Sequence, residues 1–337
     1  MIKYDILLIG PRSGRNVKGG VTILHDDMRN QIKRRGFIFS EINTNFKDIK
    51  KINVFINVLR GIISIRKSRV IILDCTFRQL VFFGPLLTFF RSSEQILIIR
   101  KFAGSFLHDL ESSNFFTRKL VHYTLARSNL NCFETKGIIQ KASKCFGKTF
   151  WFPNVRHKSI FQSPETVGDS LKVIFVGRII KEKGVLLACE AVSQLRNAEL
   201  SIYGRLEEGI TADELTAFQN VKYCGELDNS LIQEVMSQNN VLLLPTYYHG
   251  EGYPGVILEA FSVSLPVITT RHNYLPELLE DSGYLVPTHC TESIKETLEL
   301  VTESYSMLRE KGKRRFMEFE SEKVHDSFFS KLVEIAD

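Results

Sequence analysis

Two carboxylates, Glu251 and Glu259, are separated by seven residues and flank a glycine-rich segment. Apolar runs before them at 241–245 and after them at 266–270 predict buried strands of an α/β sheet. Glu251 would then lie in a loop, and Glu259 about one and a half turns into the next helix. A carboxylate beside a bound phosphate is unfavourable unless it binds hydroxyl groups, so this pair indicates a sugar phosphate or a nucleotide. An ordinary crossover with two exposed glutamates is the alternative.

The predicted helix that holds Glu259 has a start suited to anions. Pro254 fits its first position, where the missing N–H has no effect on the helix. Tyr253 is a poor side-chain cap, so the N–H groups of Gly255 and Val256 have no local acceptor. Free donors at a helix N-terminus, beside a glycine-rich loop at the end of a parallel strand, form an anion site.

Two cations, Arg178 and Lys183, follow a second apolar segment. The predicted strand 171–178 ends in Gly-Arg, and an apolar helix is predicted at 185–192. Open α/β sheets bind ligands at the carboxyl ends of their strands. Arg offers a planar fork and Lys a mobile point charge, which together suit a diphosphate. Solvated loop charges are the alternative reading of the same two residues.

Taken together, these segments resemble the retaining glycosyltransferases of family 4 (glycosyltransferase group 1), which have the GT-B fold. The resemblance covers the C-terminal half almost throughout and follows the family's order. The matching pieces are FVGRIIKEKG, SIYGRL, VKYCGEL, LLLPTYYHGEGYPGVILEAF, LPVITT, LPELL and GYLV. Each piece is weak alone, but the ordered set is specific. One departure is Ser264, where the family usually has a glycine, and we interpret it as a local backbone matter.

The resemblance implies a role for each matching residue. Glu251 would contact the donor sugar or its phosphate surroundings, and Glu259 the ribose hydroxyls. Arg178 and Lys183 match the family's diphosphate-binding pair and are, with Glu251, the candidate catalytic residues. The remaining candidate donor-binding residues are Gly19, Gly20, Gly252, Tyr253, Pro254, Gly255 and Val256.

The N-terminal half agrees less sharply. The segment 4–10 predicts a first strand, and Gly19 and Gly20 open a predicted helix, so that a ligand can approach the backbone closely. In the resembled family this Gly-Gly pair faces the donor diphosphate across the cleft, whereas a flexible turn is the plainer reading. No G-x-G-x-x-G follows the strand, which argues against an NAD enzyme.

An acceptor site is harder to place. The resembled family often has a histidine on a middle strand of the first domain, but Lys101 takes its position here, so the histidine's role is not carried over. Gly104, Ser105 and His108 follow closely and complete the candidate acceptor residues. A surface or interface histidine is the alternative for His108.

At 337 residues the chain exceeds what one core usually holds. We expect two Rossmann-like domains of the GT-B type that face each other across a cleft. The first, 1–165, would bind the acceptor and the second, 166–317, the nucleotide sugar. A charged amphipathic helix is predicted at 307–335. By the resemblance, the tail from about 318 to 337 returns to complete the first domain.

Metal and redox chemistry are not indicated. The six cysteines lack C-x-x-C spacing and are expected to be reduced thiols. The histidines show no metal-ligand spacing and the sequence contains no Asp-x-Asp, which disfavours a metal-dependent glycosyltransferase. We therefore expect no metal and no cofactor, with a UDP- or GDP-linked sugar as co-substrate. The N-terminus lacks the pattern of a secretory signal, so we expect a cytoplasmic protein.

Charge is divided unevenly along the chain. Residues 1–165 contain 28 Lys and Arg against 11 Asp and Glu, a net +17, and the rest carry 16 against 27, a net −11. Such asymmetry concerns partners rather than fold. The basic clusters at 33–35, 47–51 and 60–69 indicate docking on anionic lipid. The apolar run 52–59 fits that role, whereas 80–90 is favoured as a core helix. Nucleic acid is not favoured, because no motif for it is recognisable.

We therefore predict a retaining hexosyltransferase of bacterial cell-surface polysaccharide biosynthesis, such as lipopolysaccharide or capsule. It would act on a lipid-linked glycan as a peripheral protein on the inner face of the cytoplasmic membrane. The alternatives are a sugar-nucleotide epimerase or sugar phosphorylase of the same fold, or a non-catalytic module that binds polyanions or membranes.

Overall fold

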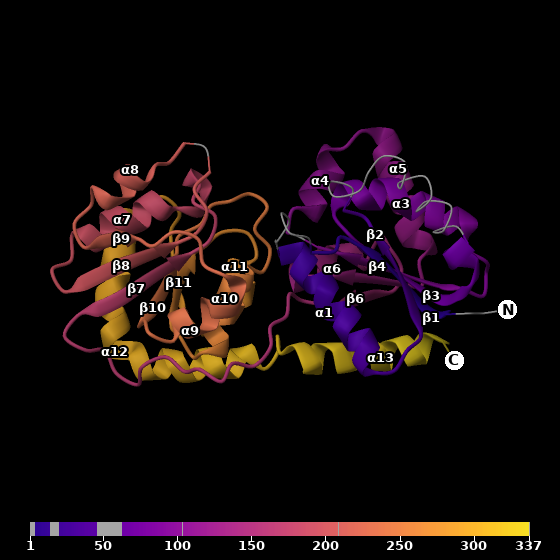
Figure 1. Ribbon diagram of the computed structural model, residues 1–337. Helices are drawn as coiled ribbons and strands as arrows, with labels where there is room; N and C mark the ends of the chain where they lie inside the picture. Colours follow the sequence, from indigo (N-terminus) through magenta and orange to yellow (C-terminus); the bar gives the residue numbers. More distant parts are fainter. Residues whose placement is uncertain (1–3, 14–19, 46–62, 103, 208, 337) are drawn as a thin grey trace. The chain divides into compact units, whose positions relative to one another are not determined.

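The computed structural model describes residues 4–13, 20–45, 63–102, 104–207 and 209–336, and the chain divides into two compact units (Figure 1). Unit 1 comprises Met1–Asn154 and Val324–Asp337, and unit 2 comprises Val155–Lys323. Each unit contains a parallel sheet of six strands covered by helices. The predicted α/β class with two Rossmann-like domains is confirmed. The candidate Gly19 and the expected features at 47–51 and 52–59 lie outside the described residues.

The sheet of unit 1 has the strand order β2-β1-β3-β4-β5-β6. Its central strands are buried along nearly their whole length, as expected when helices cover both faces of a parallel sheet. The strands are β1 Tyr4–Gly10, β2 Phe39–Asn43, β3 Ser68–Cys75, β4 Ile96–Lys101, β5 Leu130–Phe133 and β6 Thr149–Trp151. The helices are α1 Gly20–Arg34, α3 Phe77–Phe90, α4 Phe106–Ser112, α5 Phe115–Arg127 and α6 Lys136–Ala142.

The sheet of unit 2 has the order β12-β11-β10-β7-β8-β9, so that β7 and β10 are neighbours at its centre. The strands are β7 Leu171–Val176, β8 Ala198–Tyr203, β9 Val221–Tyr223, β10 Val241–Leu244, β11 Val267–Thr270 and β12 Tyr284–Val286. The helices are α7 Val185–Ser193, α8 Ala212–Thr216, α9 Ile232–Met236, α10 Gly255–Ser262, α11 Leu275–Leu279, α12 Thr291–Phe316 and α13 Ser321–Ala336, the last of which continues into unit 1.

The division between the units lies at Asn154, eleven residues before the expected boundary at 165. The segment that follows is held by unit 2. Ser163 donates from its backbone N–H to the carbonyl of Val263 at 2.7 Å, and Arg309 donates to the Ser163 carbonyl at 2.9 Å. These hydrogen bonds fix the segment after Asn154 to unit 2.

The C-terminal region forms two helices rather than the single helix expected over 307–335. Helix α12 ends at Phe316 and α13 begins at Ser321. Between them the backbone of Arg156 accepts from the Ser321 N–H at 2.9 Å and donates to the Phe319 carbonyl at 3.0 Å. This short bridge uses backbone groups that a continuous helix would need for itself, so the helix is interrupted there.

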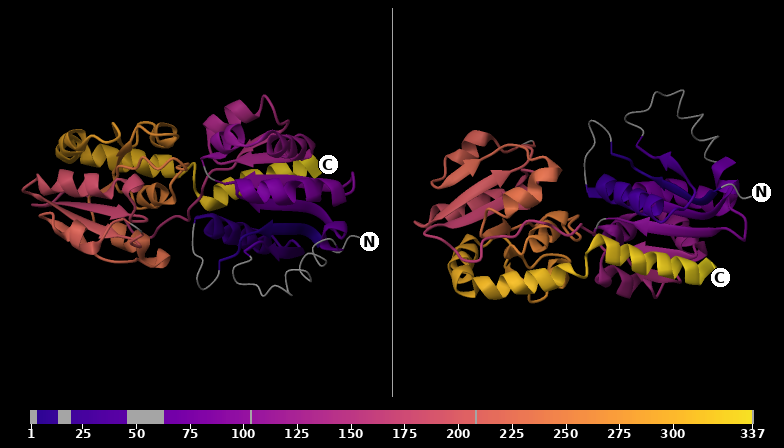
Figure 2. Two further views of the ribbon diagram at one scale, coloured as in Figure 1. Left: turned by 90° about the horizontal axis from the view of Figure 1, so that it is seen from above. Right: turned by 60° about the horizontal axis from the view of Figure 1, so that its bottom comes forward.

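Helix α13 packs on unit 1, and both views in Figure 2 draw it along the strands and helices of that unit. Phe328 meets Phe152 edge to face at 5.2 Å, and Phe329 stacks on Phe37 at 5.6 Å between ring centroids. His325 is fully buried against Phe152. The tail therefore contributes core side chains to unit 1, whose share of it begins at Val324 rather than near 318.

Helix α3 contains the apolar run expected to be a core helix, and that expectation is only half right. Its buried residues are Leu80, Gly84 and Leu87, which leaves a second face in solvent. Phe82 is 63% exposed and Phe89 is 76% exposed. The run is apolar all round, so its sequence gives no sign of which side is covered.

Ser264 adopts a left-handed backbone conformation, with φ of 58°. Glycine adopts this region without steric strain, which explains why the resembled family has a glycine there. The Ser264 hydroxyl donates to Gln162 at 2.8 Å, and its carbonyl accepts from the Ser163 hydroxyl at 2.8 Å. These bonds hold the strained turn in place, so the departure remains a local matter, as expected.

A buried charge cluster lies at the carboxyl edge of the unit 1 sheet. The ring of His25 is fully buried, with Nδ1 2.8 Å from Asp74 and Nε2 3.3 Å from Glu41. Arg100 donates to both Asp74 oxygens at 3.2 Å. Burial alone would lower the pKa of His25, but its hydrogen bonds to the two carboxylates and their charges outweigh burial and raise the pKa from 6.5 to about 9.

This cluster predicts that unit 1 loses stability as the pH rises from about 6.5 to 9. The pKa of His25 is higher in the folded than in the unfolded chain, so its stabilisation is complete below the unfolded pKa and disappears as the pH passes the folded value. The full effect is at most about 3 kcal/mol. Urea unfolding at the two pH values should show a larger loss for the wild type than for His25→Gln. An equal loss in both proteins would contradict this role for His25.

Candidate functional site

The carboxyl edge of the unit 2 sheet brings the main sequence candidates together. Arg178 follows β7, and Glu251 lies in the loop after β10, the neighbouring strand. Because the strands are parallel, both loops leave the same edge of the sheet. Lys183 and Glu259 come from the continuations of these two loops.

Lys183 and Glu251 form a buried ion pair. The Lys183 ammonium lies 2.6 Å from Glu251 Oε2, with 12% and 7% of the two side chains exposed. The Thr246 hydroxyl donates to the same oxygen at 2.8 Å. A carboxylate held by an ammonium and a hydroxyl has a fixed position, which suits a residue that must meet a ligand in one orientation.

The turn that carries Lys183 is fixed against the end of β10. The Tyr247 N–H donates to the Glu182 carbonyl at 2.7 Å. Gly184 has φ of 74°, and a Cβ atom at that position would come within 2.1 Å of the Pro245 carbonyl oxygen. Only glycine allows both this conformation and this approach. The short Lys-Gly sequence therefore brings the ammonium to Glu251.

Arg178 is more open than Lys183. Its guanidinium lies 3.5 Å from Glu207, and 47% of its side chain is exposed. It also lies over the ring of Tyr248 at 5.1 Å, while the Lys183 ammonium is 5.5 Å from the same ring centroid. The Tyr248 ring therefore lies near both cations and limits their movement.

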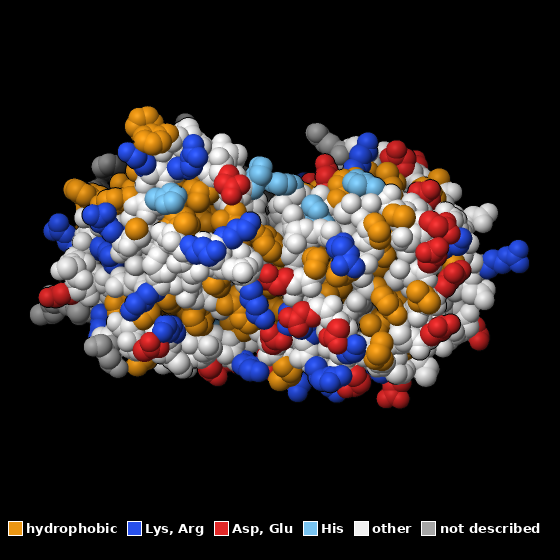
Figure 3. Space-filling model, turned by 180° about the vertical axis from the view of Figure 1, so that it is seen from behind, with side chains coloured by type: hydrophobic (Ala, Val, Ile, Leu, Met, Phe, Trp, Pro, Cys, Tyr) orange, Lys and Arg blue, Asp and Glu red, His pale blue; other side chains and the backbone are white. Residues whose placement is uncertain are grey.

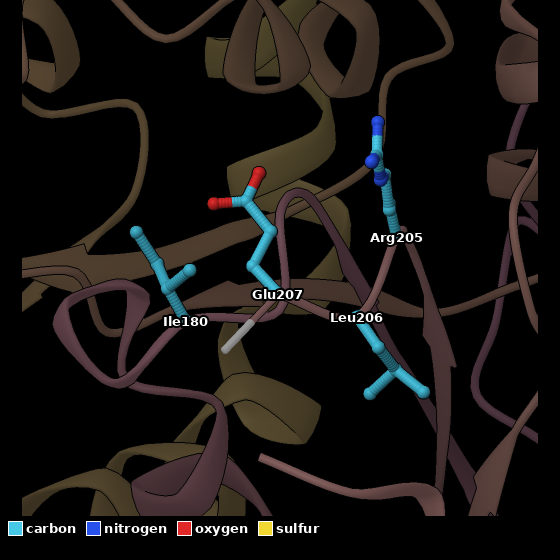
Figure 4. A pocket seen from close by; sticks show the side chains of 4 residues that line it. All are labelled: Ile180, Arg205, Leu206 and Glu207. Atoms are coloured by element: carbon cyan, nitrogen blue, oxygen red, sulfur yellow. The ribbon is translucent and has the colours of Figure 1, made fainter. Parts of the chain in front are cut away.

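An open pocket of about 460 Å³ lies at the turn that follows β8. It is lined by Ile180, Arg205, Leu206 and Glu207, and Glu207 is the carboxylate that pairs with Arg178. In Figure 4 the polar ends of Arg205 and Glu207 extend to one side, whereas Leu206 points the other way. The pocket thus offers one cation and one carboxylate beside aliphatic surface.

Helix α10 begins one residue later than expected. Pro254 is its N-cap residue rather than its first helical residue, and it makes no side-chain capping bond. In the described part of the chain no side chain caps the amides of Gly255 and Val256. Helices of this kind keep unsatisfied N–H groups at their start. The start of α10 therefore has the uncapped amides that were expected, and anion binding there stays a prediction.

Arg156 is a site residue that sequence reasoning missed. Its Nε lies 2.6 Å from Glu259 Oε1, with only 12% and 13% of the two side chains exposed. A Cβ atom built on Gly255 would lie 1.6 Å from a terminal nitrogen of Arg156, so the guanidinium lies directly over the helix start. The residue is far from the recognised motifs in sequence. Its basic neighbourhood, Arg-His-Lys after Pro153, was the only available signal.

Three of the cations described at this edge are each paired with a carboxylate. The pairs are Arg178 with Glu207, Lys183 with Glu251 and Arg156 with Glu259. An incoming diphosphate would therefore compete with the carboxylates for the cations. Each carboxylate it displaced could then bind hydroxyl groups, which is the chemistry of a nucleotide sugar.

Tyr253 and Gly252, two further donor candidates, lie buried under this surface. The Tyr253 hydroxyl donates to Glu277, and its ring meets Phe319 edge to face at 5.7 Å. The tyrosine ring thus packs inside unit 2 and positions the loop that contains Glu251. Only its backbone remains for contact with a ligand.

The candidates in unit 1 are less concentrated. Gly20 begins α1, whereas Gly19 is not described. Lys101 is buried, its ammonium donates to the Phe102 carbonyl, and burial lowers its pKa. The Ser105 hydroxyl donates to Asp109 at 2.8 Å, while Gly104 is buried and His108 exposed. None of these contacts indicates how the four acceptor candidates, Lys101, Gly104, Ser105 and His108, would bind an acceptor.

Residues 170–303 match the family model of the glycosyl transferases group 1. The curated relatives include the putative colanic acid biosynthesis glycosyltransferase WcaL of Escherichia coli, 28% identical over 38% of this chain and 35% of the relative. The amylovoran biosynthesis glycosyltransferase AmsK of Erwinia amylovora is 32% identical over 35% of this chain and 32% of the relative. The matches span about a third of the length of these relatives.

Solved structures resemble nearly the whole chain. Sucrose-phosphate synthase from Thermosynechococcus elongatus has a TM-score of 0.74 at 14% identity, covering 98% of this chain and 99% of that one. Anabaena Alr3699/HepE, solved in complex with UDP and glucose, has a TM-score of 0.73 at 13% identity, covering 98% and 100%. At these identities the likeness establishes the fold, which is that of GT-B glycosyltransferases.

Proposed function

Because unit 2 contains a glycosyl transferases group 1 domain and the chain has a GT-B fold, we propose that the protein is a glycosyltransferase that uses a nucleoside diphosphate sugar. The observation that carries the proposal is the Lys183–Glu251 pair beside Arg178 at the carboxyl edge of the unit 2 sheet. A cation and a fixed carboxylate there can bind a diphosphate and a sugar together. The pocket at the turn after β8 would take part of the nucleotide.

The proposed reaction moves a hexose-type sugar from a UDP- or GDP-linked donor to a glycan, with retention at the anomeric carbon. The leaving diphosphate gains negative charge as the glycosidic bond breaks. Arg178, Lys183 and the free amides of Gly255 and Val256 would stabilise that charge. Stabilisation of developing charge is usually the largest contribution of an enzyme to lowering the barrier of such a reaction. Glu251 would orient the sugar. No protein nucleophile is needed.

The proposed setting is the assembly of a bacterial cell-surface polysaccharide on a lipid-linked acceptor, at the inner face of the cytoplasmic membrane. Relatives named for colanic acid and amylovoran biosynthesis support the polysaccharide, and the capsular polysaccharide glycosyltransferase CapM of Staphylococcus aureus, 28% identical over 42% of this chain, adds to them. The basic first half of the chain supports an anionic membrane as partner. Among the described residues, no helix combines the length and apolar character needed to cross a membrane.

Turnover is expected to survive EDTA. The sequence has no Asp-x-Asp, and the paired cations of unit 2 provide positive charge where other glycosyltransferases use a metal ion. Release of the nucleoside diphosphate should be measured with and without chelator, with a metal-dependent transferase alongside to show that chelation is complete. Loss of turnover in EDTA and its recovery with Mn²⁺ would contradict this part of the proposal.

A further inference from the structure

Helices α3 and α5 form a pair on one side of the unit 1 sheet. They connect β3 to β4 and β4 to β5, which are neighbouring parallel strands, so right-handed crossovers place both helices on the same face. Figure 1 draws them together on that side. The helices approach closely at Gly84, where an added Cβ would lie 2.6 Å from a side-chain atom of Thr124. Their outward side chains therefore share one surface.

That surface carries a row of exposed apolar residues on each helix. On α3 the residues Phe82, Leu86 and Phe89 follow one another at helical spacing and are 63%, 44% and 76% exposed. On α5 the exposed apolar residues are Phe115, Phe116, Leu120 and Tyr123, and Phe116 is 77% exposed. Monomeric proteins seldom expose so many large apolar side chains together, and such surfaces are typical of interaction sites. We call these seven residues the α3–α5 apolar face.

The charged side chains on the two helices that carry the α3–α5 apolar face are all positive. Helices α3 and α5 contain Arg78, Arg118, Lys119 and Arg127 and no Asp or Glu. Lys119 lies over the Phe115 ring at 4.4 Å, and Arg127 over the Tyr123 ring at 4.3 Å, so cations lie directly beside the exposed rings. Figure 3 shows orange apolar and blue basic side chains close together on unit 1, drawn on the left.

We propose that the α3–α5 apolar face inserts into the surface of an anionic lipid bilayer. Exposed Phe and Leu would enter the boundary between headgroups and acyl chains, while Arg and Lys beside them would meet anionic headgroups. A two-fold dimer through this face would place the same cations against one another, which is unfavourable. The proposal rests on the membrane partner proposed above, and assigns the contact to named residues of unit 1.

Vesicle co-sedimentation in the absence of any sugar donor tests this assignment, using the full chain. Wild type should bind vesicles that contain anionic lipid, bind neutral vesicles weakly, and lose affinity as salt rises. The triple variant Phe82→Ser, Phe89→Ser, Phe116→Ser should lose at least about tenfold in vesicle affinity. Arg118→Glu with Lys119→Glu should do the same for anionic vesicles alone. A matched control is Leu300→Ser with Met307→Ser, which removes two exposed apolar residues from α12 in the acidic unit 2.

Folding and nucleotide binding are checked separately by melting temperature and by stabilisation with UDP or GDP, so failure of the membrane contact does not count against the transferase. Three results would overturn the assignment. The first is a wild type that ignores anionic vesicles. The second is equal vesicle binding by wild type and the Phe variants. The third is a dimer in solution that the Phe variants dissociate, which would assign this face to a second copy of the chain.

Discussion

Replacing Lys183 with alanine is expected to lower kcat/KM for the sugar nucleotide by at least tenfold. A charge-assisted contact to a phosphate contributes roughly 1.5–3 kcal/mol, which corresponds to about ten- to a hundredfold. The structure predicts a second effect of this substitution, a loss of stability. Glu251 is 6% exposed, so in Lys183→Ala its buried carboxylate keeps its charge without the ammonium partner. Arg178→Ala should also lose at least tenfold, through the diphosphate contact alone, since its own ion pair is exposed.

The control for this prediction is Lys181→Ala, which removes an exposed lysine from the same turn and should leave kcat/KM unchanged. The double variant Lys183→Met, Glu251→Gln removes both buried charges, so its activity is not affected by an unpaired buried charge, yet it should remain as inactive as Lys183→Ala. Full activity of Lys183→Ala or Arg178→Ala at an unchanged melting temperature would reject the diphosphate assignment.

Arg156→Ala is expected to weaken binding of the nucleoside diphosphate about tenfold or more. The guanidinium lies over the start of α10, where the free amides of Gly255 and Val256 form the predicted anion site. Its removal takes away a charge-assisted contact and leaves Glu259, which is largely buried, without its partner. Titration calorimetry with UDP and GDP measures the affinity, and thermal melting measures the accompanying loss of stability.

Two further variants separate these effects. Lys158→Ala removes an exposed cation two residues away and should bind nucleotide as wild type does. Glu259→Gln removes the carboxylate charge and keeps Arg156 in place for an anion, so weaker binding in that variant reports the hydroxyl contacts of Glu259 rather than the Arg156 contact. If Arg156→Ala is less stable but binds nucleotide with wild-type affinity, Arg156 is a structural residue and not part of the site.

The arrangement of several candidate residues in unit 2 could be predicted because their positions follow from topology. Parallel strands end at one edge of a sheet, so the loops after the predicted strands 171–178 and 241–245, which contain Arg178 and Glu251, were expected at the same edge. Arg156 could not be found in this way, because it belongs to a chain segment between the sheets. Its place depends on the backbone bridge to residues 319–321, and no local pattern records that contact.

The exposed face of α3 could not be predicted from the sequence, for a different reason. A helix that is apolar on every side predicts burial, and Leu80 and Leu87 are indeed buried. Phe82 and Phe89 have the same chemistry but lie on the side that none of the described elements covers. Sequence periodicity cannot choose between faces of equal hydropathy. The interruption between α12 and α13 also could not be predicted from the sequence pattern, because the amphipathic pattern continues through it.

Transfer itself is the most direct test of the account. A panel of UDP- and GDP-linked sugars should be incubated with the protein and a bacterial membrane extract, and both the released nucleoside diphosphate and the glycan product analysed. We predict that one donor is consumed only when the extract is present, that its sugar appears on a lipid-linked glycan with the anomeric configuration retained, and that Lys183→Ala is inactive. Conversion of a nucleotide sugar without any acceptor would indicate an epimerase. No consumption of any donor, together with no stabilisation by any nucleotide, would contradict the account and leave a binding module.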